Sequence, residues 1–385
     1  MQTTEAGPVE LSKTLAKRVT QKNCWGGEKA VGDAVLDQGR ADRLIAVTVP
    51  TEHGGDGLGV LDGARIAFNI SRVSAGAGMI YAMHMSQLFT LIRHAAATPF
   101  FDDFQKKVAR EQMLLGSITS EAGVGGDIFG SICTIDELGG GKMSLFKDCP
   151  IISYYDLTGA FLITANRIDA NGHKTQVLFV AEADQIEYSS SPEMALTGLR
   201  GVVNKSYKIT ARFDEAAIFP GNYPAIQRET MTPTVNILWS SVWSGIAWQA
   251  IDRAKRHLAK QKVEEADVAP VMRHELSRLV DKHYVMNAII RDAVAEYESN
   301  VAATDVIKGM NMSARNARLK ILCSELVNEI TQGALAIVGI GGYALDGAIS
   351  MSEVVRDALS APLQVSNYRL GIRNAKVERF LDEVL

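Results

Sequence analysis

The residues of this chain that could do chemistry are concentrated in one segment, where small polar side chains precede a run of glycines. Residues 119–127 read TSEAGVGGD and lie between two apolar runs. Because glycine has no Cβ, backbone N–H groups in such a loop can approach a bound ring or phosphate closely. A plain β-turn is the commoner explanation of a lone glycine cluster. The segment therefore predicts a ligand-binding loop if the rest of the chain provides a matching scaffold.

Two histidines are the other candidates for acid–base or ionic chemistry. His84 lies among apolar residues of a predicted helix, and its ordinary pKa near neutrality suits proton transfer. A histidine in that setting is more often a buried core residue. Arg93 and His94 could bind a carboxylate or a phosphate, although a solvated helix end explains them more simply. We therefore expect His84 to be the catalytic base if it lines the active cavity.

Several kinds of site are absent from the sequence. No group of His, Cys and Asp has metal-ligand spacing, there is no Ser-His-Asp signature, and no GxGxxG motif opens a βαβ unit. The four cysteines are widely spaced and are expected to be reduced; they are Cys24, Cys133, Cys149 and Cys323. We therefore expect no metal centre.

The composition is that of a globular protein. The chain has 385 residues, of which 47% are hydrophobic and 22% charged, enough for two or three domains with well-filled cores. A formal charge of −4 and scattered basic residues argue against a nucleic-acid partner. The N-terminus lacks a hydrophobic signal core, and no apolar run is expected to reach membrane-spanning length. These features predict a cytoplasmic enzyme or scaffold.

The elements that must position the candidate residues fall into three zones. Residues 1–113 predict an N-terminal helical domain, residues 114–228 a middle antiparallel β-domain, and residues 229–385 a C-terminal helical bundle. Within the middle zone, Asn171-Gly172 is a hairpin signal. The order helix, sheet, helix predicts an α+β protein. Strands are expected at 116–119, 161–165, 176–180 and 205–213, and long C-terminal helices at 235–260, 269–298, 313–338 and 351–363.

Four local motifs occur in the order and at the spacing of one known family. Residues 50–58 read PTEHGGDGL, 120–127 read SEAGVGGD, 197–201 read TGLRG, and GIGGY at 339–343 is followed by Arg-Asp-Ala at 356–358. On these motifs the chain resembles the acyl-CoA dehydrogenase superfamily over nearly its whole length. No single motif is specific, but four in the right order imply that family's fold. That fold has an N-terminal helical domain, a middle antiparallel β-domain and a C-terminal four-helix bundle.

The resemblance implies a flavoprotein, with FAD between the middle domain and the C-terminal helices, or FMN if the enzyme is a monooxygenase. A homotetramer or homodimer would complete the site. The implied substrate contacts are Gly126, Tyr154 and Val365. The implied cofactor contacts are Ser117, Thr119, Ser120, Ile151, Ser153, Gly339, Ser366 and Asn367.

For three of these residues a structural role is an open alternative. Ser153 could be an ordinary strand serine, and Asn367 a surface polar residue. Tyr154, with its neighbour Tyr155, could pack at a domain seam, which is the commoner role for such a pair.

The chain departs from the family at the positions where that family does its chemistry. Dehydrogenases of the family remove an α-proton with a glutamate, usually nine residues beyond the Arg of the Arg-Asp-Ala motif, and Val365 stands there. A second known location for this glutamate falls near Val235. The Arg that anchors the flavin phosphates is also missing, because the corresponding residues 261–265 read QKVEE, and Ala336 replaces a Gln. His84 or a pocket water is left as the base.

Three functions are compatible with these observations. The first is a flavin-dependent oxidoreductase acting on an acyl-CoA or acyl-carrier thioester. The second is a monooxygenase that uses reduced flavin and oxygen to hydroxylate or N-oxidise a small metabolite, with a flavin reductase or electron-transfer partner. The third is a non-redox binding scaffold with a degenerate flavin site. The overall resemblance favours the first and the missing glutamate favours the other two, and we rank them in that order.

Overall fold

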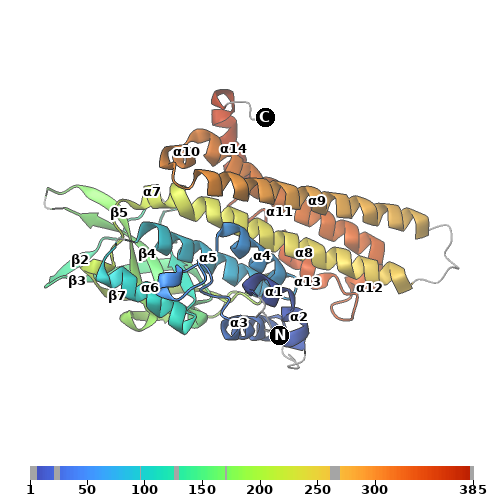
Figure 1. Ribbon diagram of the computed structural model, residues 1–385, viewed down its shortest axis with the longest axis horizontal. Coiled ribbons are helices and arrows are strands. Elements are labelled where there is room, and N and C mark those ends of the chain that lie inside the picture. Colours follow the sequence, from blue (N-terminus) through green and yellow to red (C-terminus); the bar gives the residue numbers. More distant parts are fainter. Residues whose placement is uncertain are drawn as a thin grey trace, which may run out of the picture.

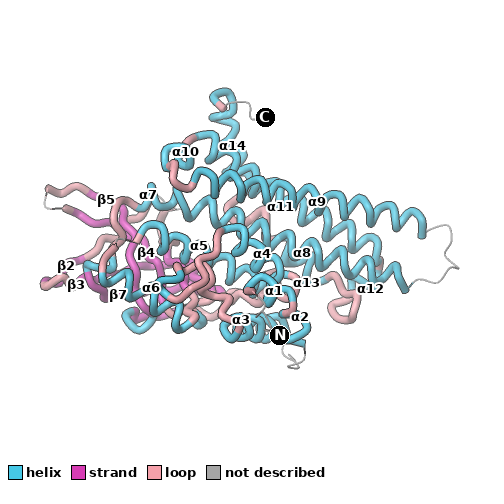
Figure 2. The backbone as a smooth tube through the Cα atoms, in the orientation of Figure 1, coloured by secondary structure: helices cyan, strands magenta, loops and turns pink. Residues whose placement is uncertain are grey.

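The computed structural model describes residues 7–20, 27–95, 97–124, 130–169, 171–260 and 269–381. Helices from both ends of the chain flank strands from its middle, and Figures 1 and 2 show the strands gathered at one end of an elongated molecule. The long C-terminal helices extend from this end to the other (Figure 1). The expected order of helices, sheet and helices is confirmed.

The N-terminal helices start at residues suited to capping them. The side chain of Ser74 accepts a hydrogen bond from the Ala77 amide at the start of α5 (Ala75–His94). The side chain of Thr98 accepts a hydrogen bond from the Phe101 amide at the start of α6 (Pro99–Glu111), and α6 has a proline in its first turn. The elements before these two are α1 (Pro8–Lys13), α2 (Leu15–Thr20), α3 (Gly27–Ala41), the 3₁₀ turn η1 (Thr51–His53) and α4 (Val60–Ser71).

The middle of the chain forms two sheets, with strand orders β1-β4-β5 and β2-β3-β7-β6. Neighbouring strands are antiparallel, as expected, except that β1 and β4 run parallel. Gly172, with a φ of 79°, lies between β4 and β5, where the Asn-Gly signal predicted a hairpin. The strands are β1 (Leu115–Ile118), β2 (Asp136–Gly139), β3 (Lys142–Ser153), β4 (Ala160–Ile168), β5 (Lys174–Glu182), β6 (Ile186–Ser190) and β7 (Asn204–Asp214).

The strands β2, β3 and β6 were not among those predicted, and β3 shows why. Its inward positions alternate, with Leu145 and Cys149 buried and Phe146 exposed between them. Lys147 lies on the same inward face and is also buried. A charged residue on the core face and Pro150 near the strand end interrupt the apolar alternation on which strand prediction depends.

Long helices make up the C-terminal part, in agreement with the expected bundle. The helices α8, α9 and α11 pack along one another, and the shorter α13 and α14 pack against α11. A π-helical segment, Gln227–Met231, joins α7 (Tyr223–Ile226) to α8. The helices are α8 (Thr232–Lys260), α9 (Ala269–Asn300), α10 (Thr304–Lys308), α11 (Met310–Val338), α12 (Ile340–Tyr343), α13 (Ser352–Leu359) and α14 (Asn367–Val377).

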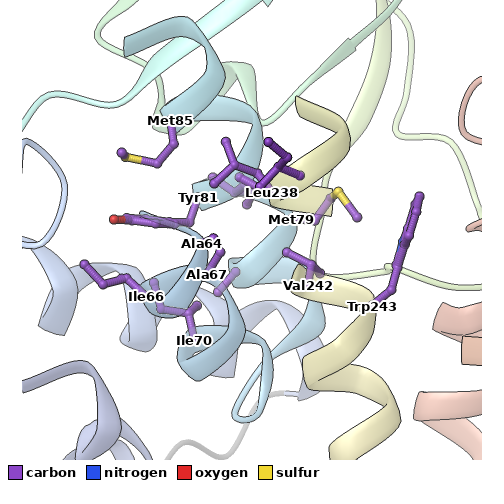
Figure 3. Close-up of a cluster of buried hydrophobic side chains, with 14 of the residues drawn as sticks. Ala64, Ile66, Ala67, Ile70, Met79, Tyr81, Met85, Leu238, Val242 and Trp243 are labelled. Atoms are coloured by element: carbon purple, nitrogen blue, oxygen red, sulfur yellow. The ribbon is translucent and has the colours of Figure 1, made fainter. Parts of the chain in front are cut away.

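One hydrophobic core joins the N-terminal helices to the C-terminal ones. Ile66 of α4, Tyr81 of α5 and Val242 of α8 are all buried in it. Figure 3 shows side chains from these three helices converging, with Trp243 at the edge of the cluster. Ser71 strengthens the contact, because its Oγ donates a 2.7 Å hydrogen bond to the Val242 carbonyl. The two helical parts therefore form one packed body.

The helix α11 is long and apolar enough to cross a membrane by length and composition alone. The expectation that no run reaches this length was therefore wrong. Cys323, Val327, Ile330 and Ala334 of α11 are buried within the bundle. The core helix of a bundle satisfies the same test, because it too is apolar over most of its circumference.

Candidate functional site

The loop after β1 and the end of β3 bring together hydroxyls that were predicted to contact a cofactor. The Oγ of Ser120 donates a 2.6 Å hydrogen bond to the carbonyl of Ile151, which links the two segments. The hydroxyls of Ser117 and Thr119 are 3.5 Å apart on the same segment as Ser120. All three side chains are partly exposed. This surface, which we call the β1–β3 edge, consists of residues 117–120 and 151–153.

The β3 side of this edge combines an apolar side chain with a fixed hydroxyl. Ile151 is 43% exposed. The Oγ of Ser153 donates a 2.6 Å hydrogen bond to Oδ1 of Asn204, and Nδ2 of Asn204 donates to the Val202 carbonyl. Ser153 and Asn204 are also register partners in the β3–β7 ladder. The strand pairing therefore sets the orientation of the Ser153 hydroxyl.

A buried carboxylate anchors the loop that follows the β1–β3 edge. Glu121 accepts hydrogen bonds from the amides of Ile132 and Cys133, at 3.1 and 2.6 Å, and from the Ser131 hydroxyl at 2.8 Å. Burial acts to raise the pKa of Glu121, but the Ser131 hydrogen bond and the charge of Lys147 outweigh it, so the pKa is lowered. The carboxylate is therefore engaged in holding the loop. The predicted substrate contact Gly126 lies outside the described residues.

Lys147 is a buried, hydrogen-bonded lysine beside the candidate site, and it was not predicted from the sequence. Its Nζ donates to the carbonyl and the hydroxyl of Thr164, at 2.6 and 2.9 Å, and lies 3.6 Å from Glu121. The side chain is fully buried. Its period-two spacing from Leu145 and Cys149 is the signal that could have found it. Lys147 ties β3, β4 and the loop after β1 together.

The structure places His84 in the core and uses both of its ring nitrogens. Its Nε2 donates a 2.8 Å hydrogen bond to the Ile45 carbonyl, and Nδ1 accepts one of 2.9 Å from the Leu115 amide. The side chain is fully buried, and burial lowers the pKa of His84 to about 4. A base needs a free nitrogen that reaches its substrate. These contacts leave no free ring nitrogen for a substrate, and they favour the alternative of a buried core histidine.

Tyr154 also lies inside the protein rather than at the β1–β3 edge. It is buried, and its hydroxyl donates a 3.0 Å hydrogen bond to the Leu115 carbonyl. Burial raises the pKa of the phenol. This position favours the alternative of packing at a seam between parts of the chain over a substrate contact at Tyr154.

The segment 363–367 contains three of the predicted contacts. Val365 is 54% exposed and has a φ of 55°, a value that is rare for a β-branched residue. The amide of Asn367 is engaged within the protein, since Oδ1 accepts from Lys320 and Ser324 and Nδ2 donates to Ser324. Ser366 precedes α14 and makes no side-chain cap. Asn367 therefore supports this segment, which makes it a poor cofactor contact.

Lys320 was not predicted as a site residue, yet it organises the segment 363–367. Its Nζ donates 2.7 Å hydrogen bonds to the Val365 carbonyl and to Oδ1 of Asn367. Burial lowers the pKa of Lys320 to about 8, with Glu325 acting in the opposite direction. Leu319 directly before Lys320 and the apolar run Ile321-Leu322-Cys323 directly after it were the available signal that this lysine is buried.

The other positions considered for chemistry are distributed along the C-terminal part. Val235 is half-buried on α8, and Gly339 ends α11 with a φ of 71°. The residues corresponding to the family's phosphate-anchoring Arg, 261–265, lie outside the described residues. The described ranges contain no cluster of His, Cys, Asp and Glu that could hold a metal ion.

Arg93 and His94 are engaged by the protein. The guanidinium of Arg93 donates to the Tyr297 hydroxyl at 3.2 Å, and it lies 3.9 Å from the Glu229 carboxylate. Nε2 of His94 lies 2.7 Å from the Thr230 hydroxyl, and burial together with the charge of Arg93 lowers the pKa of His94 to about 4. Both residues bind the π-helical segment rather than standing free for a carboxylate or phosphate.

The three parts of the chain meet beside a hollow of about 810 Å³ that none of the predicted contacts lines. Arg356, on its wall, pairs with Glu28 of α3 at 2.7 Å. Next to it, Asp357 accepts a 2.6 Å hydrogen bond from the Leu199 amide. Burial, opposed by this bond, raises the pKa of Asp357 to about 7. A Cβ on Gly198 would overlap the Arg356 carbonyl, so the chains approach closely here.

Comparison with known proteins agrees with this architecture. Residues 10–99 match the family model described as acyl-CoA dehydrogenase, N-terminal domain. The chain is similar to FMN-bound TdsC, a dibenzothiophene monooxygenase from Paenibacillus sp. A11-2, at 17% identity and a TM-score of 0.79, with 96% of each chain covered. It is similar to a glutaryl-coenzyme A dehydrogenase in complex with glutaryl-CoA, at 16% identity and a TM-score of 0.80, covering 99% of this chain and 98% of that one.

A third similar structure is the methanesulfinate monooxygenase MsuC from Pseudomonas fluorescens, at 13% identity and a TM-score of 0.77, with 98% of each chain covered. At such identities the likeness shows the fold. The chain therefore has the acyl-CoA dehydrogenase fold along its length, and residues 10–99 match that family's N-terminal domain.

Proposed function

We propose that this chain is a flavin-dependent oxidoreductase whose cofactor binds at the β1–β3 edge. The observation that carries the proposal is the combination of partly exposed hydroxyls with an exposed apolar side chain on a fold that holds FMN in a similar structure. The cofactor is FAD, with FMN as the alternative.

The residues of the β1–β3 edge fit a flavin in chemical terms. The ring system has flat apolar faces and one polar edge, and Ile151 offers an apolar surface for a face. Ser120 and Ser153 donate their hydroxyl protons to protein acceptors, and they keep lone pairs that can accept from a ligand. When bound, the flavin would supply the redox chemistry. We retain as proposed contacts Ser117, Thr119, Ser120, Ile151, Ser153, Gly339 and Ser366.

Among flavin-dependent reactions, we place oxygenation of a small metabolite first. Removal of an α-proton needs a positioned base, and neither Val365 nor Val235 can accept a proton. His84 is locked between two backbone groups. A reaction that takes its reactivity from reduced flavin and oxygen has no need of such a carboxylate. A flavin reductase would then be the partner.

The second candidate is oxidation of an acyl-CoA or acyl-carrier thioester, with an electron-transferring partner. The observation that favours it is the likeness to the glutaryl-coenzyme A dehydrogenase over 99% of this chain, together with the family match at residues 10–99. In this reaction a pocket water would have to accept the proton.

The test begins with the absorption spectrum of the purified protein, mixed with FAD or FMN if it is colourless. A protein that binds neither flavin contradicts the proposal and leaves a binding scaffold. Anaerobic bleaching of bound flavin by acyl thioesters supports the dehydrogenase. Oxygenated product formed only with a flavin reductase, NADH and oxygen, with no bleaching by thioesters, supports the monooxygenase. Ile151→Asp, which charges the proposed ring contact, is expected to weaken flavin binding, and exposed Ile168→Asp is its matched control.

We also propose that the chain self-associates through its C-terminal part as a homotetramer or homodimer in the cytoplasm. Large apolar side chains stand exposed at the end of α11 and beside α14; they are Ile340, Tyr343, Leu345, Leu363 and Tyr368. Exposed apolar side chains of this size, gathered at these two places, are typical of surfaces that bind another protein. Sedimentation of the purified protein as a monomer at micromolar concentration would contradict this proposal.

A further inference from the structure

Lys320 is a buried cation that forms no ion pair with any residue in the described part of the chain. Its side chain is fully buried on α11, and within the described residues no carboxylate oxygen lies within 4.0 Å of its Nζ. Its neighbours are the Val365 carbonyl, Oδ1 of Asn367 and the ring of Trp243, whose centroid is 5.8 Å away. Figure 3 shows Trp243 pointing away from the rest of its hydrophobic cluster. The ammonium group of Lys320, on α11, lies over this ring.

Burying an ammonium group without a paired carboxylate costs free energy of folding, so its presence here indicates a structural or functional role. Taking an ammonium group out of water is strongly unfavourable, and the usual compensation is a paired carboxylate. Here two oxygen acceptors and an aromatic face provide the compensation. A methionine or leucine would fill the same volume without this cost. We therefore infer that the ammonium is retained for the groups to which it donates hydrogen bonds.

What Lys320 holds is a strained piece of backbone. Val365 has a φ of 55°, and the left-handed region is strained backbone for a β-branched residue. The hydrogen bond from Lys320 ends on the carbonyl of this same residue. Its second hydrogen bond ends on Asn367, two residues later. Both bonds therefore act on the strained segment.

We propose that Lys320 is a positioning residue that fixes the segment 363–367, which carries Val365, a substrate contact that the resemblance implies. The identity of the substrate site rests on the proposed function. The hydrogen bonds by which Lys320 fixes the segment do not depend on it. Strain of this kind collects at functional sites, where the surrounding structure maintains it. Lys320 thus supplies rigidity at the position where the family has a reactive carboxylate.

The first experiment measures hydrogen exchange of the amides in residues 360–368 in the protein without added flavin. Lys320→Met is expected to speed their exchange about tenfold, which corresponds to about 1.4 kcal/mol of lost protection. The control is Lys282→Met, which removes an exposed ion pair with Glu329. If Lys320→Met does not fold, Asn367→Ala, which removes one of the two acceptors of Lys320, takes its place. Unchanged exchange overturns the proposal.

The second experiment separates positioning from general support of the bundle. Glycine adopts a φ near 55° without strain, so Val365→Gly removes the need for a clamp. In the Lys320→Met background, Val365→Gly is expected to restore flavin affinity to within about threefold of wild type, after a loss of about tenfold in Lys320→Met alone. Failure of this rescue, or a Lys320→Met protein with unchanged flavin affinity, overturns the proposal.

The two experiments keep this proposal apart from the proposed function. If the wild-type protein binds no flavin, the proposed function fails. The exchange experiment still tests the role of Lys320. Slower amide exchange in the double variant Lys320→Met/Val365→Gly than in Lys320→Met would support that role. If flavin binds and neither the exchange nor the affinity responds to Lys320, the positioning role fails alone.

Discussion

The amide of Leu115 donates a 2.9 Å hydrogen bond to Nδ1 of His84. Nε2 of the same ring donates to the Ile45 carbonyl, so one side chain connects α5, the first strand of the middle domain and the loop before η1. The two bonds require a neutral ring that is protonated on Nε2. A residue that could have been a catalytic base is instead a connector between two parts of the fold.

Replacing His84 tests this connecting role. His84→Ala leaves a buried amide and a buried carbonyl unpaired, and we expect a loss of about 3 kcal/mol or more in the free energy of unfolding. His84→Gln keeps one acceptor and one donor on a flexible chain and is expected to lose less. Urea denaturation of the three proteins measures the difference. Equal stability of His84→Ala and wild type would contradict the connecting role.

Asp357 predicts a pH dependence of stability. Its pKa is raised from 3.8 to about 7 in the folded protein, so the folded state holds a proton that the unfolded state releases between these values. The stability that this group contributes is present at low pH and is lost as the pH rises through 7. Asp357→Asn removes this loss. Its stability relative to wild type is expected to rise from pH 5 to about pH 7, by at most about 1.4 kcal/mol per pH unit, and to level off by pH 8.

This comparison between Asp357→Asn and wild type cancels the groups that titrate elsewhere, such as His84. Denaturation curves at pH 5, 6, 7 and 8 measure it. A difference that stays constant over this range would show that Asp357 is ionised throughout.

The buried pair of Lys147 and Glu121 predicts a non-additive effect. Lys147→Met leaves the Glu121 carboxylate without its cation and the Thr164 carbonyl without its donor, and we expect a loss of about 3 kcal/mol. In the double variant Lys147→Met/Glu121→Gln the lone charge is gone. Its loss of stability is expected to be smaller than the sum of the two single losses, which a double-mutant cycle measures. Strict additivity would mean that the two groups do not interact.

A side chain at Gly198 is expected to clash with neighbouring backbone where the N-terminal helices, the strands and the C-terminal helices meet. In Gly198→Ala the new Cβ would overlap the Arg356 carbonyl, so backbone must move. We expect a drop of several degrees in the midpoint of thermal unfolding. Gly371→Ala is the control, because its Cβ would meet open space on α14 and is expected to be neutral or stabilising. Equal midpoints for Gly198→Ala and wild type would exclude the close approach.

The fold was predictable because its main signals are local and periodic. Helical spacing located α8, α9 and α11, and Asn171-Gly172 marked the β4–β5 turn. The ordered motifs then implied the arrangement of the parts. The strand β3 was not predictable from the same rules, because Lys147 places a charge where the period-two pattern requires an apolar residue.

The candidate site was less predictable, because a side chain's partners come from distant parts of the chain. The grouping of Ser120 with Ile151 followed from the resemblance, and the structure joins them by a hydrogen bond. Nothing local to His84 indicated that Ile45 and Leu115 would occupy both of its nitrogens. Lys320 is a similar case, since its acceptors follow it by 45 and 47 residues. Long-range contacts of this kind leave no periodic signature.

The π-helical segment Gln227–Met231 has a consequence for every residue-by-residue comparison with proteins of this fold. A π turn holds more residues than an α turn, so the chain entering α8 carries an extra residue over the same axial rise. A relative with a regular α-helix there is expected to be one residue shorter in this segment. An alignment that counts straight through the segment would then be wrong by one residue in the first turn of α8, where Val235 lies. One residue corresponds to about 100° of rotation around the helix axis. Deleting one residue from the segment should therefore rotate α7 against α8 while leaving the α8 seam with α11 in register.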